Sequence, residues 1–255
     1  MKEFKRIFIF GCSFTNFRWP TWADMIRYST DKPFQNWGQK GIGNVAIMHK
    51  MVECDLKNNL NEDDLLIAQW STWTREDRFY DHWWGEGGVF HNPRYGDKFC
   101  EHWWHWNNDI VKNSTAIIAA NKMYNFDYQF TFWGFPNQPD FDRAAKDVNI
   151  EMQNLYRSNL PHIDEFPVDI NTNFEGTCHD GHGDIKSHLH FFKNSITPRF
   201  GFELSPAKEK QLLDLHYKIA DSLDIKKQDY GRQMEIIAGL VEKVDPSIYK
   251  GHLGF

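Results

Sequence analysis

An apolar run near the start of the chain ends directly in a turn that carries a serine. Residues Arg6 to Phe10 read Arg-Ile-Phe-Ile-Phe, and Gly11, Cys12 and Ser13 follow. Because the run is rich in Ile and Phe and alternates little, it is typical of a strand covered on both faces of a parallel sheet. Gly11 lets the backbone turn sharply at the carboxyl end of this strand, where open α/β sheets bind ligands. Ser13 is therefore a candidate nucleophile, although a plain Gly/Ser/Thr turn gives the same pattern.

The rest of the chain alternates helical and strand-like patterns, as a doubly wound parallel sheet requires. The patterns predict helices over Trp22 to Ser29, Asn44 to Asn58, Asp109 to Met123 and Gln233 to Val244, and a helix that starts at Pro206 with Ser205 as its N-cap. Strands are predicted over Leu65 to Trp70 and Phe126 to Trp133. The expected core stripes are Val45, Met48 and Val52; Ile110, Ile117 and Ala120; Leu212, Leu215, Ile219 and Leu223; and Met234, Ile237 and Val241.

Three segments, in chain order, resemble motif blocks of the SGNH (GDSL-type) hydrolases. Residues 11–15, Gly-Cys-Ser-Phe-Thr, resemble the first block, with Cys12 where the family most often has aspartate. Residues 36–44, Asn-Trp-Gly-Gln-Lys-Gly-Ile-Gly-Asn, resemble its Asn-x-Gly-x-x-Gly block, and residues 178–188, Cys-His-Asp-Gly-His-Gly-Asp-Ile-Lys-Ser-His, resemble its last block. The resemblance implies one domain over residues 1–255 with a three-layer α/β/α, flavodoxin-like parallel sheet. It also implies ester hydrolysis without a cofactor.

The resemblance further implies a role for residues of each block. Ser13 would attack an ester carbonyl, His182 would take and return the proton, and Asp180 would orient His182. The backbone N–H groups of Ser13 and Gly41 would donate to the oxyanion. The alternative for Gly41 is a loop glycine that caps the helix beginning near Asn44.

The spacing of the last block leaves competitors for two of these roles. The family usually has Asp-x-x-His followed by Pro, whereas this chain has Asp-x-His followed by Gly. His179, Asp184 and His188 therefore remain candidates for the base and for the residue that orients it.

The family's third block, Gly-x-Asn-Asp, is missing. The strand predicted to end at Trp70 is followed by Ser71, Thr72 and Trp73, with no asparagine. A hydroxyl of Ser71 or Thr72, or the indole N–H of Trp73, could donate to the oxyanion instead. The loss of one such donor typically lowers the rate by about a hundred- to a thousandfold. The departure fits a weaker enzyme, a different substrate, or a fold kept without the activity.

Two long segments, at about 75–108 and 135–176, exceed the minimal fold and are predicted insertions. The first holds five tryptophans, and a tryptophan can stack on a sugar face or wall an acyl pocket. The expected substrate contacts are Trp70, Trp73, Trp83 and Trp84. The alternative is a satellite core of aromatic side chains. Because the resembled family includes carbohydrate deacetylases, an O-acetyl ester on a carbohydrate is the favoured substrate.

Three other functions remain open. The same machinery run in reverse would make an acyltransferase. A metal-dependent hydrolase could use the cluster from His179 to His190, because imidazoles and carboxylates bind zinc and iron, but neither His-Glu-x-x-His nor His-x-His-x-Asp-His is present. A metal site would also leave Ser13 and Gly41 unexplained. A catalytically inactive glycan-binding or assembly protein could use the tryptophans alone.

Composition and charge limit which partners and which cellular locations are expected for this chain. The formal net charge of −6 and the lack of a Lys/Arg run argue against a nucleic-acid partner. No apolar run approaches the length of a membrane span, and the charged start leads only into the first strand, so a cytoplasmic location without a signal peptide is expected.

Two further expectations concern the state of the four cysteines and the pH dependence set by the histidine base. Cys12, Cys54, Cys100 and Cys178 are widely spaced, so reduced, packed thiols are expected, with a Cys12–Cys178 disulfide or a cysteine nucleophile as the alternatives. A neutral histidine base predicts that activity falls as the pH drops through roughly 6 to 7.

Overall fold

The computed structural model describes residues 3–72, 75–80, 83–85, 96–102, 106–132, 158–166, 173–178 and 180–250. Within these residues a five-stranded parallel sheet has the order β2-β1-β3-β6-β7. Its strands are β1 (Arg6–Phe10), β2 (Phe34–Asn36), β3 (Asp64–Trp70), β6 (Tyr128–Thr131) and β7 (Asp164–Glu165). Counted along the chain, this order is 2-1-3-4-5, which is the flavodoxin-like order. β4 (Arg78–Tyr80) and β5 (Trp83–Gly85) form a separate antiparallel pair.

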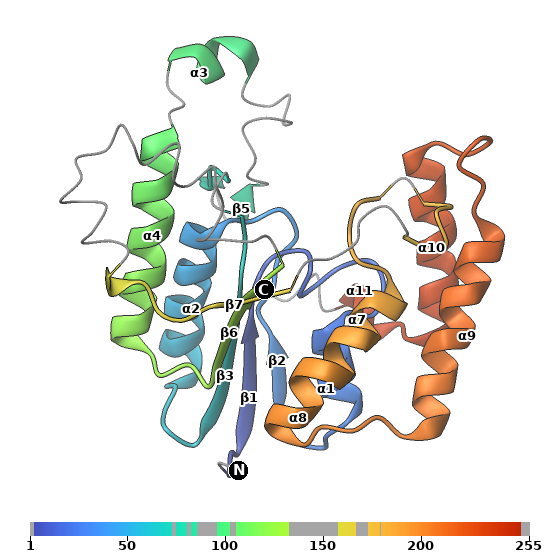
Figure 1. The fold of residues 1–255 in the computed structure, drawn as a ribbon, viewed down its shortest axis with the longest axis horizontal. Helices are drawn as coiled ribbons and strands as arrows, with labels where there is room; N and C mark the ends of the chain where they lie inside the picture. The colour runs from blue at the N-terminus through green and yellow to red at the C-terminus, as the bar shows by residue number, and fades with distance from the viewer. Residues whose placement is uncertain are drawn as a thin grey trace.

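Helices cover both faces of the sheet, so the expected three-layer α/β/α architecture is confirmed (Figure 1). One face carries α2 (Asn44–Asn58) and α4 (Trp106–Met123), which pack against each other. The other carries α1 (Trp22–Tyr28), α7 (Ile185–Phe191), the π-helix η1 (Phe192–Ile196) and α8 (Thr197–Phe200). Outside α7 lie α9 (Pro206–Ser222) and α10 (Tyr230–Val244), and the shorter α3 (Gly96–His102) and α11 (Ser247–Lys250) complete the described helices.

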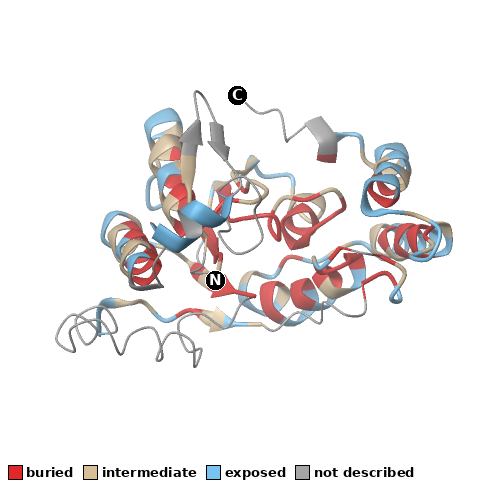
Figure 2. Cartoon of the chain, turned by 90° about the horizontal axis from the view of Figure 1, so that it is seen from above, coloured by how far each residue is buried: buried red, intermediate tan, exposed pale blue. Residues whose placement is uncertain are grey.

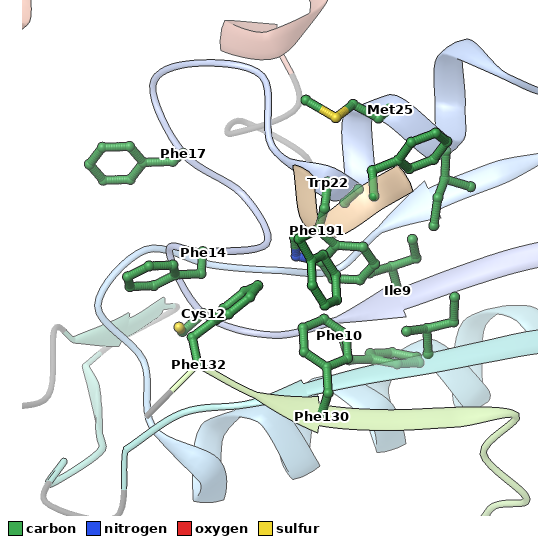
Figure 3. Close-up of a cluster of buried hydrophobic side chains, with 14 of the residues drawn as sticks. Ile9, Phe10, Cys12, Phe14, Phe17, Trp22, Met25, Phe130, Phe132 and Phe191 are labelled. Carbon is green, nitrogen blue, oxygen red and sulfur yellow. The ribbon is translucent and has the colours of Figure 1, made fainter. Parts of the chain in front are cut away.

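The core lies along the two central strands. Every residue of β3 is buried, as is every residue of β1 after Arg6, and the buried positions gather on the strands and on the sides of the helices that face them (Figure 2). Aromatic rings fill the layer between the sheet and α1 and α7. Phe130 lies 5.0 Å from Trp22 and 4.6 Å from Phe191, measured between ring centroids (Figure 3). Burial on both faces explains why these strands read as continuous apolar runs.

The sequence patterns predict most of these elements closely. The bounds of α2 agree with the prediction, α4 starts three residues earlier than expected, and Ser205 caps α9 with Pro206 as its first residue. The stripes of α4, α9 and α10 are buried as expected. The elements that were not predicted include the short strand β2 and the helix α7, whose N-cap is Asp184.

The predicted core stripe of α2 is wrong. Val45, Met48 and Val52 are only partly buried, whereas the fully buried apolar residues of this helix include Ile47 and Met51. The helix has apolar residues on more than one side, and it packs on both β1 and α4. Each of these two neighbours therefore covers a different row of residues on the helix. Periodicity alone cannot show which row is more deeply buried.

Of the two expected insertions, the second lies largely outside the described residues and the first is described only in part, so both stay predictions, as does the single-domain organisation. The described start of the first insertion packs onto the fold. Both carboxylate oxygens of Asp77 accept backbone N–H groups at the start of α2, from Gly43 at 2.6 Å and from Ala46 at 3.0 Å. Arg75 donates to the carbonyl of Ile42 at 2.8 Å. Among the described helices, none has both the length and the apolar character that crossing a bilayer requires.

We predict opposite effects of two glycine-to-alanine substitutions. A Cβ on Gly11 would lie 2.1 Å from Thr15 Oγ1 and 2.9 Å from Gln69 Oε1, so Gly11→Ala should lower the free energy of unfolding by about 3 kcal/mol or more. Gly239 is exposed inside α10 and a Cβ there meets nothing within 4 Å, so Gly239→Ala should raise it by about 1 kcal/mol. Urea unfolding measures both, and a Gly11→Ala protein as stable as the parent would contradict the tight packing of this turn.

Candidate active site

The turn after β1 is held by one buried amide. Ser13 is 1% exposed, and its turn closes through a 2.9 Å hydrogen bond from the Thr15 N–H to the Cys12 carbonyl. Gln69, near the end of β3, offers its Oε1 to three donors: the Cys12 N–H at 3.2 Å, the Cys12 thiol at 3.3 Å and the Thr15 hydroxyl at 3.1 Å. Because Gln69 is fully buried, these bonds fix the turn in a low dielectric, where they are strongest.

The loop after β2 packs against the same turn. Asn36 donates from Nδ2 to the Thr15 carbonyl at 2.9 Å and accepts the Gly38 N–H at 3.0 Å. A Cβ on Gly38 would lie 2.9 Å from Thr15 Cγ2, so this approach requires glycine. Gly41 has φ of +80°, a conformation that glycine adopts without strain. Among the described residues, the backbone N–H groups of Ser13 and Gly41 have no hydrogen-bond acceptor.

The loop from Asn173 to Gly183 brings Asp180 and His182 to this turn. The buried Asn173 donates from Nδ2 to the carbonyl oxygens of both Asp180 and His182. The indole N–H of Trp19, which follows the serine turn, donates to the Gly183 carbonyl at 2.9 Å. The two loops are therefore joined directly, although they are more than 160 positions apart in the sequence.

Ser13, His182 and Asp180 form a hydrogen-bonded chain. Ser13 Oγ lies 2.7 Å from His182 Nε2, and His182 Nδ1 contacts Asp180 Oδ1, which also accepts the backbone N–H of His182 at 2.8 Å. The imidazole stacks on Phe17 at 4.0 Å between ring centroids and lies 4.9 Å from Phe14. Both phenylalanines lie beyond the carboxyl end of β1 (Figure 3).

The environment keeps Asp180 ionised. Burial alone would raise the pKa of this carboxyl group, but the hydrogen bond and charge of the His182 ring outweigh burial, helped by the His182 N–H and the Tyr230 hydroxyl. The net effect holds the pKa of Asp180 below its usual range. A carboxylate that stays ionised and hydrogen-bonded to Nδ1 fixes the tautomer in which Nε2 can accept the proton of Ser13.

The other candidates of the last block do different work. Asp184 is the N-cap of α7, where Oδ1 accepts the Ser187 N–H at 2.8 Å. His188 is buried, and burial lowers its pKa to about 3, so it stays neutral, while His190 is exposed. His179 lies outside the described residues. Across the described part of the chain, no three His, Cys, Asp or Glu side chains are placed to hold a metal ion.

The missing third block would follow β3, where this chain has Ser71 and Thr72. The Ser71 backbone is clamped by the Asn44 side chain, which accepts the Ser71 N–H at 2.7 Å and donates to the Ser71 carbonyl at 3.1 Å. The Ser71 hydroxyl is buried and has no hydrogen-bond partner among the residues that the structure describes. Thr72 is partly buried, and Trp73 lies outside the described residues.

The expectation that Trp70 contacts substrate is wrong. Its side chain is fully buried, its indole N–H donates to Gln129 Oε1 at 2.9 Å, and its ring packs near Phe126. Trp70 ends a strand whose residues are all buried, so it is part of the core. Trp83 and Trp84 lie in β5, but their side chains, like Trp73, are outside what the structure describes.

The side chains of three cysteines are described, and all three are buried and free: Cys12, Cys54 and Cys178. The Cys12–Cys178 disulfide is therefore not formed. Burial raises the pKa of Cys54 to about 12 and that of Cys178 to about 11, so both thiols are protonated at neutral pH. These two behave as small apolar side chains, as expected.

Sequence reasoning missed the residues that hold the site together. Gln69 is an amide in an otherwise apolar strand run, which is a usable signal for a buried polar role near the sheet's carboxyl edge. Asn173 falls in the second expected insertion, and Tyr230 precedes the predicted start of the last long helix. No local pattern marks these two, because their partners are distant in the sequence or lie in an irregular loop.

Comparisons with known proteins give no family for this chain. No family model matches it, and no curated protein matches it. A solved structure described as a gut microbial diltiazem-metabolizing enzyme is similar at 14% identity with a TM-score of 0.42. That similarity covers 78% of this chain and 47% of the other, so this chain spans about half the length of its neighbour.

The buried His188 predicts an acid-sensitive stability. Unfolded His188 takes a proton below about pH 6.5, whereas the folded form resists protonation to about pH 3. The unfolded state therefore binds more protons in this window, and the free energy of unfolding falls on acidification by up to about 1.4 kcal/mol per pH unit from this group. Urea unfolding between pH 6.5 and 4 should show a shallower slope for His188→Gln. His190→Gln, at an exposed position of the same helix, should keep the parental slope; equal slopes in all three proteins would contradict the prediction.

Proposed function

We propose that this chain is a serine hydrolase of the SGNH type that cleaves an acyl ester through a covalent intermediate on Ser13. One observation carries the proposal: the hydrogen-bonded chain from Ser13 Oγ through His182 to the ionised Asp180. A nucleophile, a base within hydrogen-bond reach and a third group that orients the base are the signature of covalent acyl transfer. These three hydrogen-bonded side chains lie at the carboxyl end of β1, at the edge where open parallel sheets bind ligands.

The proposed reaction transfers two protons through His182. The proton of the Ser13 hydroxyl goes to the leaving alcohol, and a proton of the attacking water restores that hydroxyl. Ser13 Oγ attacks the ester carbonyl carbon while His182 Nε2 takes the hydroxyl proton, and a tetrahedral oxyanion forms. The C–O bond to the alcohol then breaks, and His182 returns the proton to the departing oxygen. Water attacks the acyl-enzyme with His182 again as base, and collapse releases the acid and restores Ser13. Asp180 stabilises the imidazolium at each stage and does not itself take the proton.

The proposed oxyanion donors are the N–H groups of Ser13 and Gly41. Both lack a hydrogen-bond acceptor among the described residues, and fixed backbone donors need no reorganisation during the reaction. The Ser71 hydroxyl, which is buried without a partner in the described ranges, is proposed as the replacement for the missing asparagine, with Thr72 as the alternative. The proposed substrate is an O-acetyl ester on a carbohydrate, which follows from the resemblance and the tryptophan-rich insertion.

Labelling with a fluorophosphonate tests the nucleophile. This reagent modifies an activated serine, so we predict one adduct by intact mass, mapped by peptide sequencing to Ser13. Ser13→Ala should abolish the adduct, and His182→Ala should slow its formation by at least about a thousandfold. Two control variants should label like the parent. Ser222→Ala changes the last residue of α9, and His162→Ala changes an exposed residue beside β7. A folded parent protein that gives no adduct at Ser13 would sink the proposal.

Turnover of acetylated sugars separates the proposed chemistry from a metal-dependent one. We predict acetate release that survives chelator treatment and disappears in Ser13→Ala, because the proposed nucleophile is the serine. The reverse pattern, in which chelator abolishes activity and Ser13→Ala retains it, would favour a metal-dependent hydrolase. Adding a second sugar alcohol measures the share of acyl groups that are transferred instead of hydrolysed.

A further inference from the structure

The first turn of α10 contacts the loop that carries Asp180. Tyr230, the first residue of this helix, donates its hydroxyl to Asp180 Oδ2 at 2.9 Å. One turn later, the fully buried Gln233 donates to the Thr177 carbonyl at 2.9 Å. Two side chains of one helix thus bind two points of the same loop, which limits how that loop can shift relative to α10.

The two carboxylate oxygens of Asp180 have separate partners. Oδ1 accepts from the ring and the backbone N–H of His182, and Oδ2 accepts from Tyr230. A carboxylate with donors on both oxygens cannot rotate about its last bond without losing a charge-assisted hydrogen bond. The Tyr230 hydroxyl therefore keeps Oδ1 directed at His182.

The position of Tyr230 is itself fixed. Asp229 caps α10 and accepts the Arg232 N–H at 2.8 Å, which sets the start of the helix. Tyr230 is 42% exposed, but the burial of its hydroxyl and the neighbouring carboxylate raise the pKa of that hydroxyl, which therefore remains a donor at neutral pH. Asp180 itself is 6% exposed, so few other donors can replace Tyr230 at Oδ2.

We propose that Tyr230 is a positioning residue of the catalytic relay, a fourth member that acts on Ser13 only through Asp180 and His182. The proposal rests on the proposed serine-hydrolase function. It assigns the C-terminal helices a part in the chemistry, because α10 carries the group that completes the hydrogen bonding of the carboxylate. Tyr230 contacts Asp180 and is not proposed to touch the substrate.

Removing the hydroxyl alone tests this role. Tyr230→Phe keeps the ring and deletes the donor, so kcat should fall about tenfold with KM changed less than twofold. Without this donor the negative charge of Asp180 is less neutralised and attracts the imidazolium of His182 more strongly, so the acid limb of kcat/KM should move to higher pH by about half a unit or more. Tyr217→Phe, at a half-exposed tyrosine of α9, is the matched control and should change neither kcat nor the pH profile.

A double-mutant cycle shows whether Tyr230 acts through Asp180. In an Asp180→Ala background the hydroxyl has no carboxylate to orient, so adding Tyr230→Phe should change the fluorophosphonate labelling rate less than twofold. A full tenfold further loss in that background would overturn the proposal, because the effect would then bypass Asp180. Parental kcat and pH profile in the single variant Tyr230→Phe would overturn it as well.

The design separates this proposal from the proposed function. If the parent labels at Ser13 and turns over ester while Tyr230→Phe behaves like the parent, only the role of Tyr230 fails. If the parent does not label at Ser13, the serine-hydrolase proposal fails first. Thermal unfolding of each variant identifies any loss of activity that comes from a loss of folded protein.

Discussion

The contact between Ser13 Oγ and His182 Nε2 joins residues 169 positions apart, and the geometry of the site depends on it. A hydrogen bond of this kind weakens steeply as its distance and angle drift, so both loops must be held to within a fraction of an ångström. The structure holds them by polar contacts to the backbone. Trp19 binds the Gly183 carbonyl, and Asn173 binds the carbonyls that flank Gly181, so the loops are fixed to each other and within themselves.

Gln69 does the corresponding work on the serine side. Its buried oxygen receives three donors from the turn, and each would lose a partner if the amide were removed. A buried donor left without a partner costs about 1 to 3 kcal/mol, so the turn is stable only in register with β3. Gly11 and Gly38 make this approach possible, because a Cβ at either position would overlap the Thr15 side chain. The contacts that pack this turn against the sheet therefore also fix the position of Ser13.

The sequence predicts the parts of this arrangement that local patterns encode. β1, α2 and the cap at Ser205 follow from hydrophobic runs and capping residues, and the motif blocks bring Ser13, Asp180 and His182 into consideration. Patterns fail where tertiary neighbours decide the outcome. Trp70 looks like a platform for a substrate but lies in a layer covered on both sides. Tyr230 is exposed, and nothing in its own segment indicates that its hydroxyl lies 2.9 Å from Asp180 Oδ2.

The missing third block has a physical consequence for the proposed chemistry. An asparagine does lie near the end of β3, but its side chain is held by the Ser71 backbone: Asn44 Oδ1 accepts the Ser71 N–H, and Nδ2 donates one of its two hydrogens to the Ser71 carbonyl. Within the described part of the chain the buried Ser71 hydroxyl has no partner, a state that costs free energy unless an acceptor binds it. An oxyanion formed beside it would be such an acceptor, and the gain would then fall in the transition state, where binding energy speeds the reaction.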